Sequence, residues 1–213
     1  EGMETRYDDK VPSSCGKMLG PEYALLQPIY AELHDRIPPR EGPIRRILIF
    51  FGGVDRSNLT QMAIEAVVDL NRPDIEVDVV MSDKSPHLGS IMELVTEYPN
   101  IKLHGTLPTL ALLMSKADLS IGAAGTTIWE RLSLGLPAVV VALAKNQRLV
   151  AQYLGKKKLI LYIGEMKDIT NQLFIESINV YIQEDNLSSW SKNCWEMCDG
   201  KGVYRVYATL KKR

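Results

Sequence analysis

A run of small residues between two apolar stretches is the part of this sequence best suited to bind a ligand. Residues 117–121 have the pattern of a short buried strand, and a second one follows at 138–142. Between them lies a loop of Gly122, Ala123, Ala124 and Gly125. Because these residues have almost no side chains, a ligand can approach the loop backbone closely. A strand, a small-residue loop and a helix start in this order are typical of a phosphate-binding loop.

The residues after this loop could supply hydroxyl and carboxylate groups. Thr126 and Thr127 fall where a helix is predicted to begin, and the free N–H groups there favour an anion. Glu130 lies one turn further on, where a carboxylate can accept hydrogen bonds from two hydroxyl groups, as from a ribose. Together these residues indicate a nucleotide diphosphate. Taken alone, they fit equally well a helix with Thr126 as its N-cap and Glu130 in its first turn.

The surrounding sequence predicts the elements that position this loop. Apolar, β-rich runs alternate with segments of helical pattern and crossover length, which is typical of a parallel sheet buried on both faces. We therefore expect an α/β domain over residues 44–213, a doubly wound, Rossmann-like parallel sheet of about six strands. The predicted strands are 47–51, 76–81, 101–105, 118–122, 138–142 and 159–163. Ligands of such sheets bind at the carboxyl ends of the strands.

A second glycine turn follows the first predicted strand. It contains Gly52, Gly53 and Asp55, and it precedes a helix that we expect Ser57 or Asn58 to cap. This turn and the loop at 122–127 could line one crevice. The sequence contains neither a G-x-G-x-x-G fingerprint nor a G-x-x-x-x-G-K-[ST] loop, which argues against dinucleotide oxidoreductases and P-loop nucleotidases.

Residues 1–43 differ in character from the rest of the chain. We expect a helix over 22–36, followed by a proline-rich linker over 37–43. This front segment has no predicted strand. It reads as an interlobe helix and linker, as though the chain began part-way through a longer protein.

Composition narrows the classes of function. The 213 residues carry 25 Lys and Arg against 26 Asp and Glu, a balance that argues against non-specific nucleic-acid binding. The basic run at 156–158 is expected to be solvated surface, and no apolar run reaches the roughly 18 residues of a membrane span. Three cysteines, Cys15, Cys194 and Cys198, lack disulfide or zinc-site spacing, so we expect a reducing, cytoplasmic setting and buried packing for the last two.

Five motifs in order give the chain a resemblance to a known family. They are LGPEYALLQP at 19–28, FFGGVD at 50–55, ADLSIGAAGTTIWERLSLGLP at 117–137, AKNQ at 144–147 and DGKGVYRV at 199–206. Together they resemble the C-terminal half of the UDP-sugar hydrolases of pseudaminic acid biosynthesis and the related spore-coat polysaccharide biosynthesis proteins. That family is in turn similar to two-lobed GT-B glycosyltransferases. The resemblance runs from about residue 19 to the C-terminus and depends on all five motifs rather than on any one.

The resemblance implies a site and partners for this chain. It implies that UDP or a UDP-sugar binds with its diphosphate at 122–127 and its ribose at Glu130. Gly52, Gly53 and Asp55 would face the sugar phosphate. Asn146 and Gln147 would border the same opening, although a turn, cap or packing role is the favoured interpretation for Asn146 and Tyr23. An N-terminal lobe, in this chain or a separate one, would complete the cleft, with Tyr23 and the helix behind it between the lobes. The resemblance implies no cofactor and no metal.

The sequence also departs from the family. The family's N-terminal lobe supplies a Gly-His motif whose histidine is thought to activate water, and no such lobe is present here. His34, His87 and His104 are the three histidines, and each has a position typical of packing or surface. We therefore assign no catalytic residue. The alternatives left open are a glycosyltransferase lobe with the same UDP site and a non-catalytic module that binds a partner chain.

Overall fold

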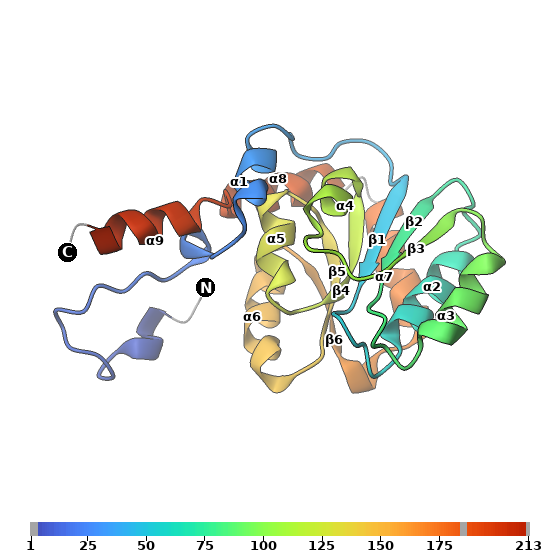
Figure 1. The fold of residues 1–213 in the computed structure, drawn as a ribbon, viewed down its shortest axis with the longest axis horizontal. Helices are drawn as coiled ribbons and strands as arrows, with labels where there is room; N and C mark the ends of the chain where they lie inside the picture. Colours follow the sequence, from blue (N-terminus) through green and yellow to red (C-terminus); the bar gives the residue numbers. More distant parts are fainter. Residues whose placement is uncertain (1–3, 184–186, 212–213) are drawn as a thin grey trace.

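A six-stranded parallel sheet forms the centre of the computed structural model, which describes residues 4–183 and 187–211 (Figure 1). The strands are β1 (Arg46–Phe50), β2 (Glu76–Val80), β3 (Ile101–His104), β4 (Leu119–Ala123), β5 (Ala138–Ala142) and β6 (Leu161–Glu165). Their spatial order is β3-β2-β1-β4-β5-β6. The predicted doubly wound sheet of six strands is confirmed, and the strand boundaries differ from the predicted ones by at most about two residues, within the usual uncertainty.

Two hydrophobic cores, one on each face of the sheet, hold the helices in place. Alternate strand residues point to opposite faces: Ile47 and Ile49 enter one core, and Leu48 enters the other. The first face is covered by α2 (Leu59–Asp69), α3 (Leu88–Thr96) and α7 (Asn171–Gln183). The second is covered by α1 (Pro28–His34), α4 (Ala111–Lys116), α5 (Thr127–Ser133) and α6 (Lys145–Lys156), with α8 (Leu187–Met197) packed on α5.

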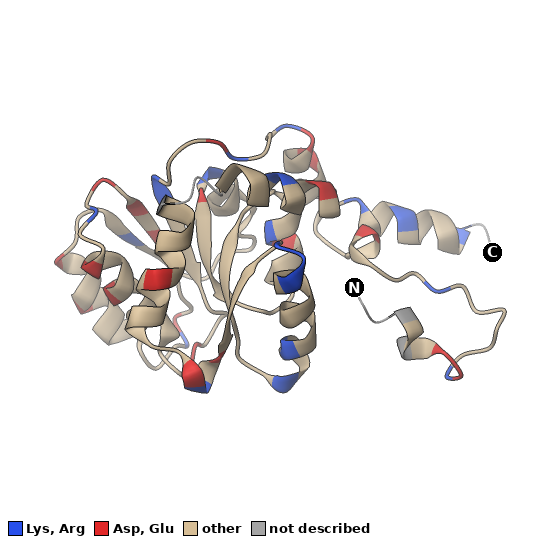
Figure 2. Ribbon diagram, turned by 180° about the vertical axis from the view of Figure 1, so that it is seen from behind, with Lys and Arg blue, Asp and Glu red and all other residues tan. Residues whose placement is uncertain are grey.

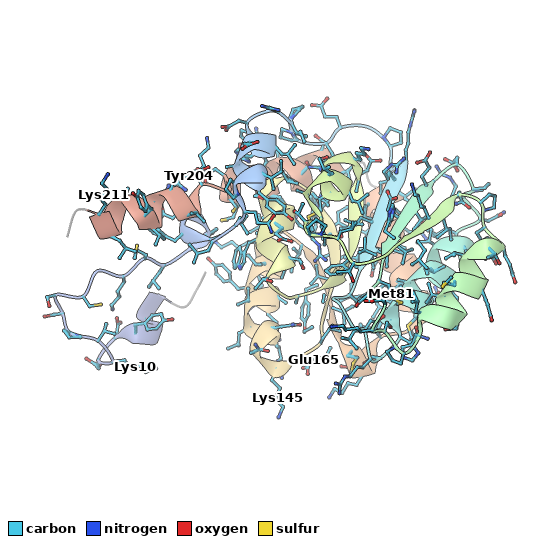
Figure 3. The ribbon with its side chains drawn as sticks, in the orientation of Figure 1. Lys10, Met81, Lys145, Glu165, Tyr204 and Lys211 are labelled. Carbon is cyan, nitrogen blue, oxygen red and sulfur yellow. The ribbon has the colours of Figure 1, made fainter. Side chains whose placement is uncertain are left out.

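The strand order reverses between β1 and β4, and this brings the two predicted loops together. Phe50 at the end of β1 lies opposite Gly122 near the end of β4. The turn at Gly52 and the loop after Gly122 therefore leave the sheet from neighbouring positions. This is the place where doubly wound sheets form a crevice for ligands. Lys145 and Glu165, which follow β5 and end β6, lie along the same lower edge of the molecule in Figure 3.

The predicted helix over 22–36 is wrong in its first half. A short 3-10 turn, η2 (Pro21–Tyr23), is followed by extended backbone, and α1 begins only at Pro28. Gln27 has φ −62° and ψ 147°, because the ring of Pro28 disfavours helical backbone in the residue before it. Pro28 is itself well suited to the first turn of a helix, where its missing N–H has no partner to lose.

The linker at 37–43 has no regular secondary structure, but Arg40 ties it to the domain. Its Nε and Nη2 donate to the carbonyls of Ala117 and Met114 at 3.0 and 2.6 Å. Burial lowers the pKa of Arg40 to about 10, and the charge of Asp118 opposes that effect. The linker therefore follows the amino-terminal edge of the sheet, opposite the predicted ligand crevice. Its role between lobes remains a prediction.

Both ends of the described chain extend away from the sheet (Figure 1). They contain η1 (Glu4–Tyr7) and α9 (Gly202–Lys211), and Tyr204 on α9 is exposed (Figure 3). Arg205 pairs with Asp199 and donates to the Glu22 carbonyl, which fixes the first turn of α9 to η2. Lys, Arg, Asp and Glu positions are scattered over the whole ribbon (Figure 2). Within 4–183 and 187–211, no helix is both long and apolar enough to cross a bilayer.

The cysteines agree with the packing prediction. Cys194 and Cys198 are buried and unbridged, Cys15 is exposed, and the Cys194 thiol donates to the Leu159 carbonyl at 2.9 Å. Burial raises the pKa of Cys194 to about 12, so its thiol stays protonated. A short 3-10 turn, η3 (Met166–Asp168), follows β6 and completes the described elements.

Candidate functional site

A pocket of about 250 Å³ lies at the carboxyl edge of the sheet, on the face covered by α4 and α5. Of the predicted site residues, Gly53, Thr127 and Glu130 line it together. The structure thus joins the turn after β1 to the start of α5, as the sequence predicted. The other lining residues are Gln27, Phe50, Val80, Ser82 and the segment 106–110.

The loop after β4 leaves consecutive backbone donors unpaired. The N–H groups of Gly125, Thr126 and Thr127 have no acceptor among the residues that the structure describes, whereas Ala124 N–H donates to the Val141 carbonyl at 2.8 Å. The side chains of Thr126 and Thr127 likewise make no hydrogen bond within the described chain, and α5 has no side-chain N-cap. Thr126 does occupy the N-cap position of α5, with Glu130 in the first turn, as the alternative interpretation has it, but its side chain caps no N–H group. Unpaired donors beside a pocket are a suitable site for an anion.

Arg131 lies beneath this loop and joins it to β1. Its side chain is 1% exposed, and its Nη1 and Nη2 donate to the carbonyls of Ala123 and Phe50 at 3.0 and 3.4 Å. Burial lowers its pKa to about 10, and the negative charge of Glu130 opposes that effect. Gly122 makes room for this guanidinium, since a Cβ there would lie 2.1 Å from the Phe50 oxygen and 2.4 Å from Arg131 Nη2.

Glu130 is half-buried in the wall of the pocket. Burial raises the pKa of its carboxyl group, while hydrogen bonding to Tyr30 and the charge of Arg131 lower it. Desolvation of this kind strengthens the hydrogen bonds that a carboxylate accepts from a ligand. The carboxylate is thus held in a setting suited to hydroxyl donors.

The turn after β1 uses its acidic residue internally. Asp55 is buried, and its Oδ1 and Oδ2 accept from the N–H groups of Leu59 and Thr60 at 3.1 and 2.7 Å. Asn58, one of the two predicted caps, occupies the N-cap position of α2, but its side chain makes no cap and Asp55 takes that role. The Asp55 carboxylate therefore faces α2 rather than the pocket. Gly52 has φ 95°, which a glycine adopts readily, and Gly53 is exposed at the pocket.

Asn146 and Gln147 lie in the first turn of α6, outside the residues that line this pocket. Asn146 is exposed, and Gln147 accepts from the Leu143 N–H at 2.8 Å. The Gln147 amide nitrogen also lies beside Gly125, 3.9 Å from where a Cβ would stand. Gln147 thus supports the backbone next to the loop, and a ligand contact for Asn146 stays a prediction.

Each histidine has a structural partner. His34 donates to the Ser133 carbonyl at 2.7 Å and stacks on Trp195. His87 contacts the Arg56 carbonyl. His104 contacts the buried Asp78 at 2.6 Å. None of the three lines the pocket. In the described parts of the chain, no three His, Cys, Asp or Glu side chains are grouped so as to hold a metal ion.

Sequence reasoning missed most of the far wall of the pocket. The segment 106–110 joins β3 to α4 and contributes its residues Thr106, Leu107 and Thr109 there, while Gln27 reaches over to donate to the Pro108 carbonyl at 3.3 Å. No motif marks this segment. Its position directly after a predicted strand could have indicated a place in the pocket wall, because the loops at the carboxyl ends of parallel strands form the ligand crevice.

Comparison with known proteins finds related sequences that include a spore coat polysaccharide biosynthesis protein and a UDP-sugar hydrolase. The chain is 26% identical over 196 residues to the spore coat polysaccharide biosynthesis protein SpsG of Bacillus subtilis, covering 90% of this chain and 57% of that protein. It is 25% identical over 151 residues to the UDP-2,4-diacetamido-2,4,6-trideoxy-beta-L-altropyranose hydrolase of Campylobacter jejuni, covering 71% of this chain and 53% of the relative. The chain thus spans little more than half the length of either protein.

Solved structures share the fold. The UDP-GlcNAc 2-epimerase of Neisseria meningitidis, bound to UDP-GlcNAc, matches 96% of this chain and 57% of its own with a TM-score of 0.65 at 18% identity. The sheet and its helices therefore have the architecture of a GT-B C-terminal lobe. The family model that matches, over residues 47–192, is the glycosyltransferase family 28 C-terminal domain. Because this match spans more than half of the chain, the protein belongs to that family.

Proposed function

We propose that this chain is the lobe that binds UDP in an enzyme acting on a UDP-sugar. The observation that carries the proposal is the set of unpaired N–H groups at Gly125, Thr126 and Thr127, next to a pocket that Thr127 and Glu130 both line. In this arrangement the loop binds the diphosphate through backbone donors and the two threonine hydroxyls.

The nucleoside would occupy the pocket itself. Glu130 accepts hydrogen bonds from the ribose hydroxyls, in keeping with its partly desolvated carboxylate. Phe50, Val80 and Leu107 give the pocket apolar walls, against which a planar base can pack. The predicted residues Gly52 and Gly53 border the side toward the sugar phosphate, where the lack of side chains leaves space.

The proposed reaction is hydrolysis, in which water displaces UDP from the anomeric carbon of a diacetamido-trideoxy sugar. Similarity to the Campylobacter hydrolase supports this assignment. As the bond to the sugar breaks, negative charge grows on the departing diphosphate, and the loop donors would stabilise it. Loss of one such donor commonly costs about 3 kcal/mol of transition-state stabilisation. None of the residues assigned to the proposed UDP site would activate the water. That group would come from an N-terminal lobe of the same or another chain.

Glycosyl transfer is the second candidate, and the match to a glycosyltransferase domain favours it. The same UDP contacts serve both reactions, since they act on the leaving group rather than on the acceptor. Incubation of the full natural polypeptide with UDP-sugars separates the two. Free sugar formed without an added acceptor supports hydrolysis, whereas turnover that requires an acceptor hydroxyl supports transfer.

Titration calorimetry tests the shared part of the proposal. We expect saturable binding of UDP, weaker binding of UMP because it lacks the second phosphate, and weaker binding of ADP because of its larger base. Glu130→Ala should weaken UDP binding, and Glu97→Ala, at the exposed end of α3, is a matched control that should not. UMP that binds as tightly as UDP would overturn the role of the loop.

A further inference from the structure

Arg131 on α5 is a buried cation whose hydrogen bonds all go to neutral groups. Its side chain is 1% exposed, and burial lowers its pKa only to about 10, so it stays charged at neutral pH. Its two acceptors are backbone carbonyls, and its Nε has no hydrogen-bond partner within the described chain. A charge buried in this way costs stability that an apolar side chain at the same place would not cost. Its presence therefore points to a role beyond packing.

The guanidinium lies where the strand order reverses, beneath the loop before α5. Its Nη1 donates to Ala123 at the end of β4, and its Nη2 donates to Phe50 at the end of β1, at 3.0 and 3.4 Å. Phe50 also lines the pocket. Ala123 precedes Gly125, the first of the unpaired donors, by two residues, or about 8 Å of backbone at most. An anion bound to the loop would thus interact with this buried charge with little screening by salt.

The two carbonyl groups explain why an arginine suits this position. Carbonyl oxygens at the carboxyl end of a strand carry partial negative charge, which would repel a phosphate group at the same edge of the sheet. Arg131 donates to one such oxygen from each of two neighbouring strands. It therefore offsets both partial charges and fixes the ends of β1 and β4 relative to each other. A lysine would supply the charge but not the planar fork that reaches two acceptors.

Arg40 provides an internal comparison. It is also buried, donates to two backbone carbonyls and has a pKa that burial lowers to about 10. However, it lies at the opposite edge of the sheet, where Asp118 supplies a negative charge. Glu130 has a corresponding effect on Arg131, but Glu130 lines the pocket, where the ribose is proposed to bind. The two arginines are thus alike in burial and bonding and differ in their distance from the pocket.

We propose that Arg131 is a positioning residue that supplies a buried positive charge for the diphosphate bound at the loop before α5. This inference rests on the proposed UDP site. Arg131 does not touch the ligand: it holds the two strand ends and attracts the phosphate groups through the loop backbone. Because the attraction grows with the charge of the ligand, UDP should gain more from this residue than UMP does.

Calorimetry with UDP and UMP at neutral pH tests the inference, because UDP carries the larger negative charge. Arg131→Met removes the positive charge and keeps an apolar stem, and we expect UDP to bind about tenfold and UMP about threefold more weakly. Arg131→Lys keeps the charge, so UDP affinity should stay within about threefold of wild type. Arg40→Met is the matched control for loss of a buried guanidinium, and both affinities should stay within about twofold.

Two outcomes would overturn the inference. One is unchanged UDP affinity in a folded Arg131→Met variant, and the other is an equal loss for UDP and UMP, which would indicate a structural role alone. Wild-type protein that binds no UDP would instead overturn the proposed function itself. If Arg131→Met does not fold, side-chain Nε–H signals of the wild-type protein provide the test. The signal of Arg131 should shift with UDP and that of Arg40 should not, and an unmoved Arg131 signal would contradict the inference.

Discussion

The helices α2 and α5 both begin in glycine-containing loops after neighbouring strands, yet their first turns are completed differently. At α2, Asp55 accepts from the N–H groups of Leu59 and Thr60, so the donors are satisfied within the chain. At α5, no side chain caps the helix, and the N–H groups of Thr126 and Thr127 have no acceptor in the described structure. The difference indicates that the donors of the first loop are satisfied internally, whereas those of the second stay unpaired, as the proposed diphosphate site requires.

The largest loss of stability that we expect comes from a change at Gly122, in the strand that leads into the loop before α5. Gly122→Ala would place a Cβ 2.1 Å from the Phe50 oxygen and 2.4 Å from Arg131 Nη2. We expect a loss of about 3 kcal/mol in the free energy of unfolding, measured in urea, because strand backbone and a buried guanidinium cannot move away. Gly125→Ala is the control: its nearest neighbour lies at 3.9 Å, and equal losses in the two variants would contradict this account of the loop.

A substitution in the loop before α2 should change the stability of the fold rather than the affinity for UDP. Asp55→Ala removes two hydrogen bonds to the start of α2, and we expect a loss of about 2 kcal/mol in the free energy of unfolding. UDP affinity of the folded variant should stay within about twofold, because this carboxylate faces α2. Chemical denaturation and calorimetry on the same sample check both. A large loss of affinity with little loss of stability would place Asp55 at the ligand instead, as the family resemblance implies.

Substitutions in the loop before α5 should instead change the affinity for UDP and leave the stability of the fold nearly unchanged. Thr126→Ala together with Thr127→Ala removes two hydroxyls that make no internal hydrogen bond. We expect UDP to bind about tenfold more weakly in calorimetry, with stability changed by less than about 1 kcal/mol. Thr209→Ala, on the exposed part of α9, provides the control for threonine removal. Unchanged UDP affinity in the double variant would rule out a ligand role for these hydroxyls.

The ion pair between Asp199 and Arg205, which holds the first turn of α9, should have the smallest effect on stability. It lies away from both loops and therefore serves as a reference for them. Hydrogen bonding to Arg205 lowers the pKa of Asp199 from 3.8 to about 2. A carboxyl group with a lowered folded pKa stabilises the fold above its unfolded pKa, and this contribution is lost as the pH falls from about 4 to about 2. Because the pair is partly exposed, Asp199→Asn should cost only about 0.5 kcal/mol at pH 7, and UDP affinity should be unchanged. Thermal melts of the variant and wild type should converge at pH 2; a constant difference would contradict the ion-pair explanation.

Much of the fold could be predicted because local patterns determine it. The run 138–142 contains only Ala and Val and forms β5 with the predicted boundaries. The error in the helix at 22–36 was avoidable, since Pro28 disfavours helical backbone at Gln27. The cap of α2 was harder, because Asp55 reaches Thr60 only through a backbone with positive φ at Asp55 and Asn58.

The lining of the candidate pocket could be predicted where it is local in the sequence and not where it depends on distant contacts. Gly53, Thr127 and Glu130 were predicted from motifs and line one pocket. Arg131 was not, because its role depends on the Phe50 carbonyl, which is 81 residues away. The pocket residue Thr109 was not predicted either, because its hydroxyl group donates to Tyr30, 79 residues away, and no short motif records such a contact.

Amide chemical shifts during a UDP titration test the central claim most directly. In ¹⁵N-labelled protein, the signals of Gly125, Thr126 and Thr127 should shift with one common saturation curve, because these N–H groups gain a phosphate acceptor. The signals of Leu59 and Thr60, which Asp55 already satisfies, should move little. Shifts that favour the start of α2, or no shift at the start of α5 at millimolar UDP, would contradict the account.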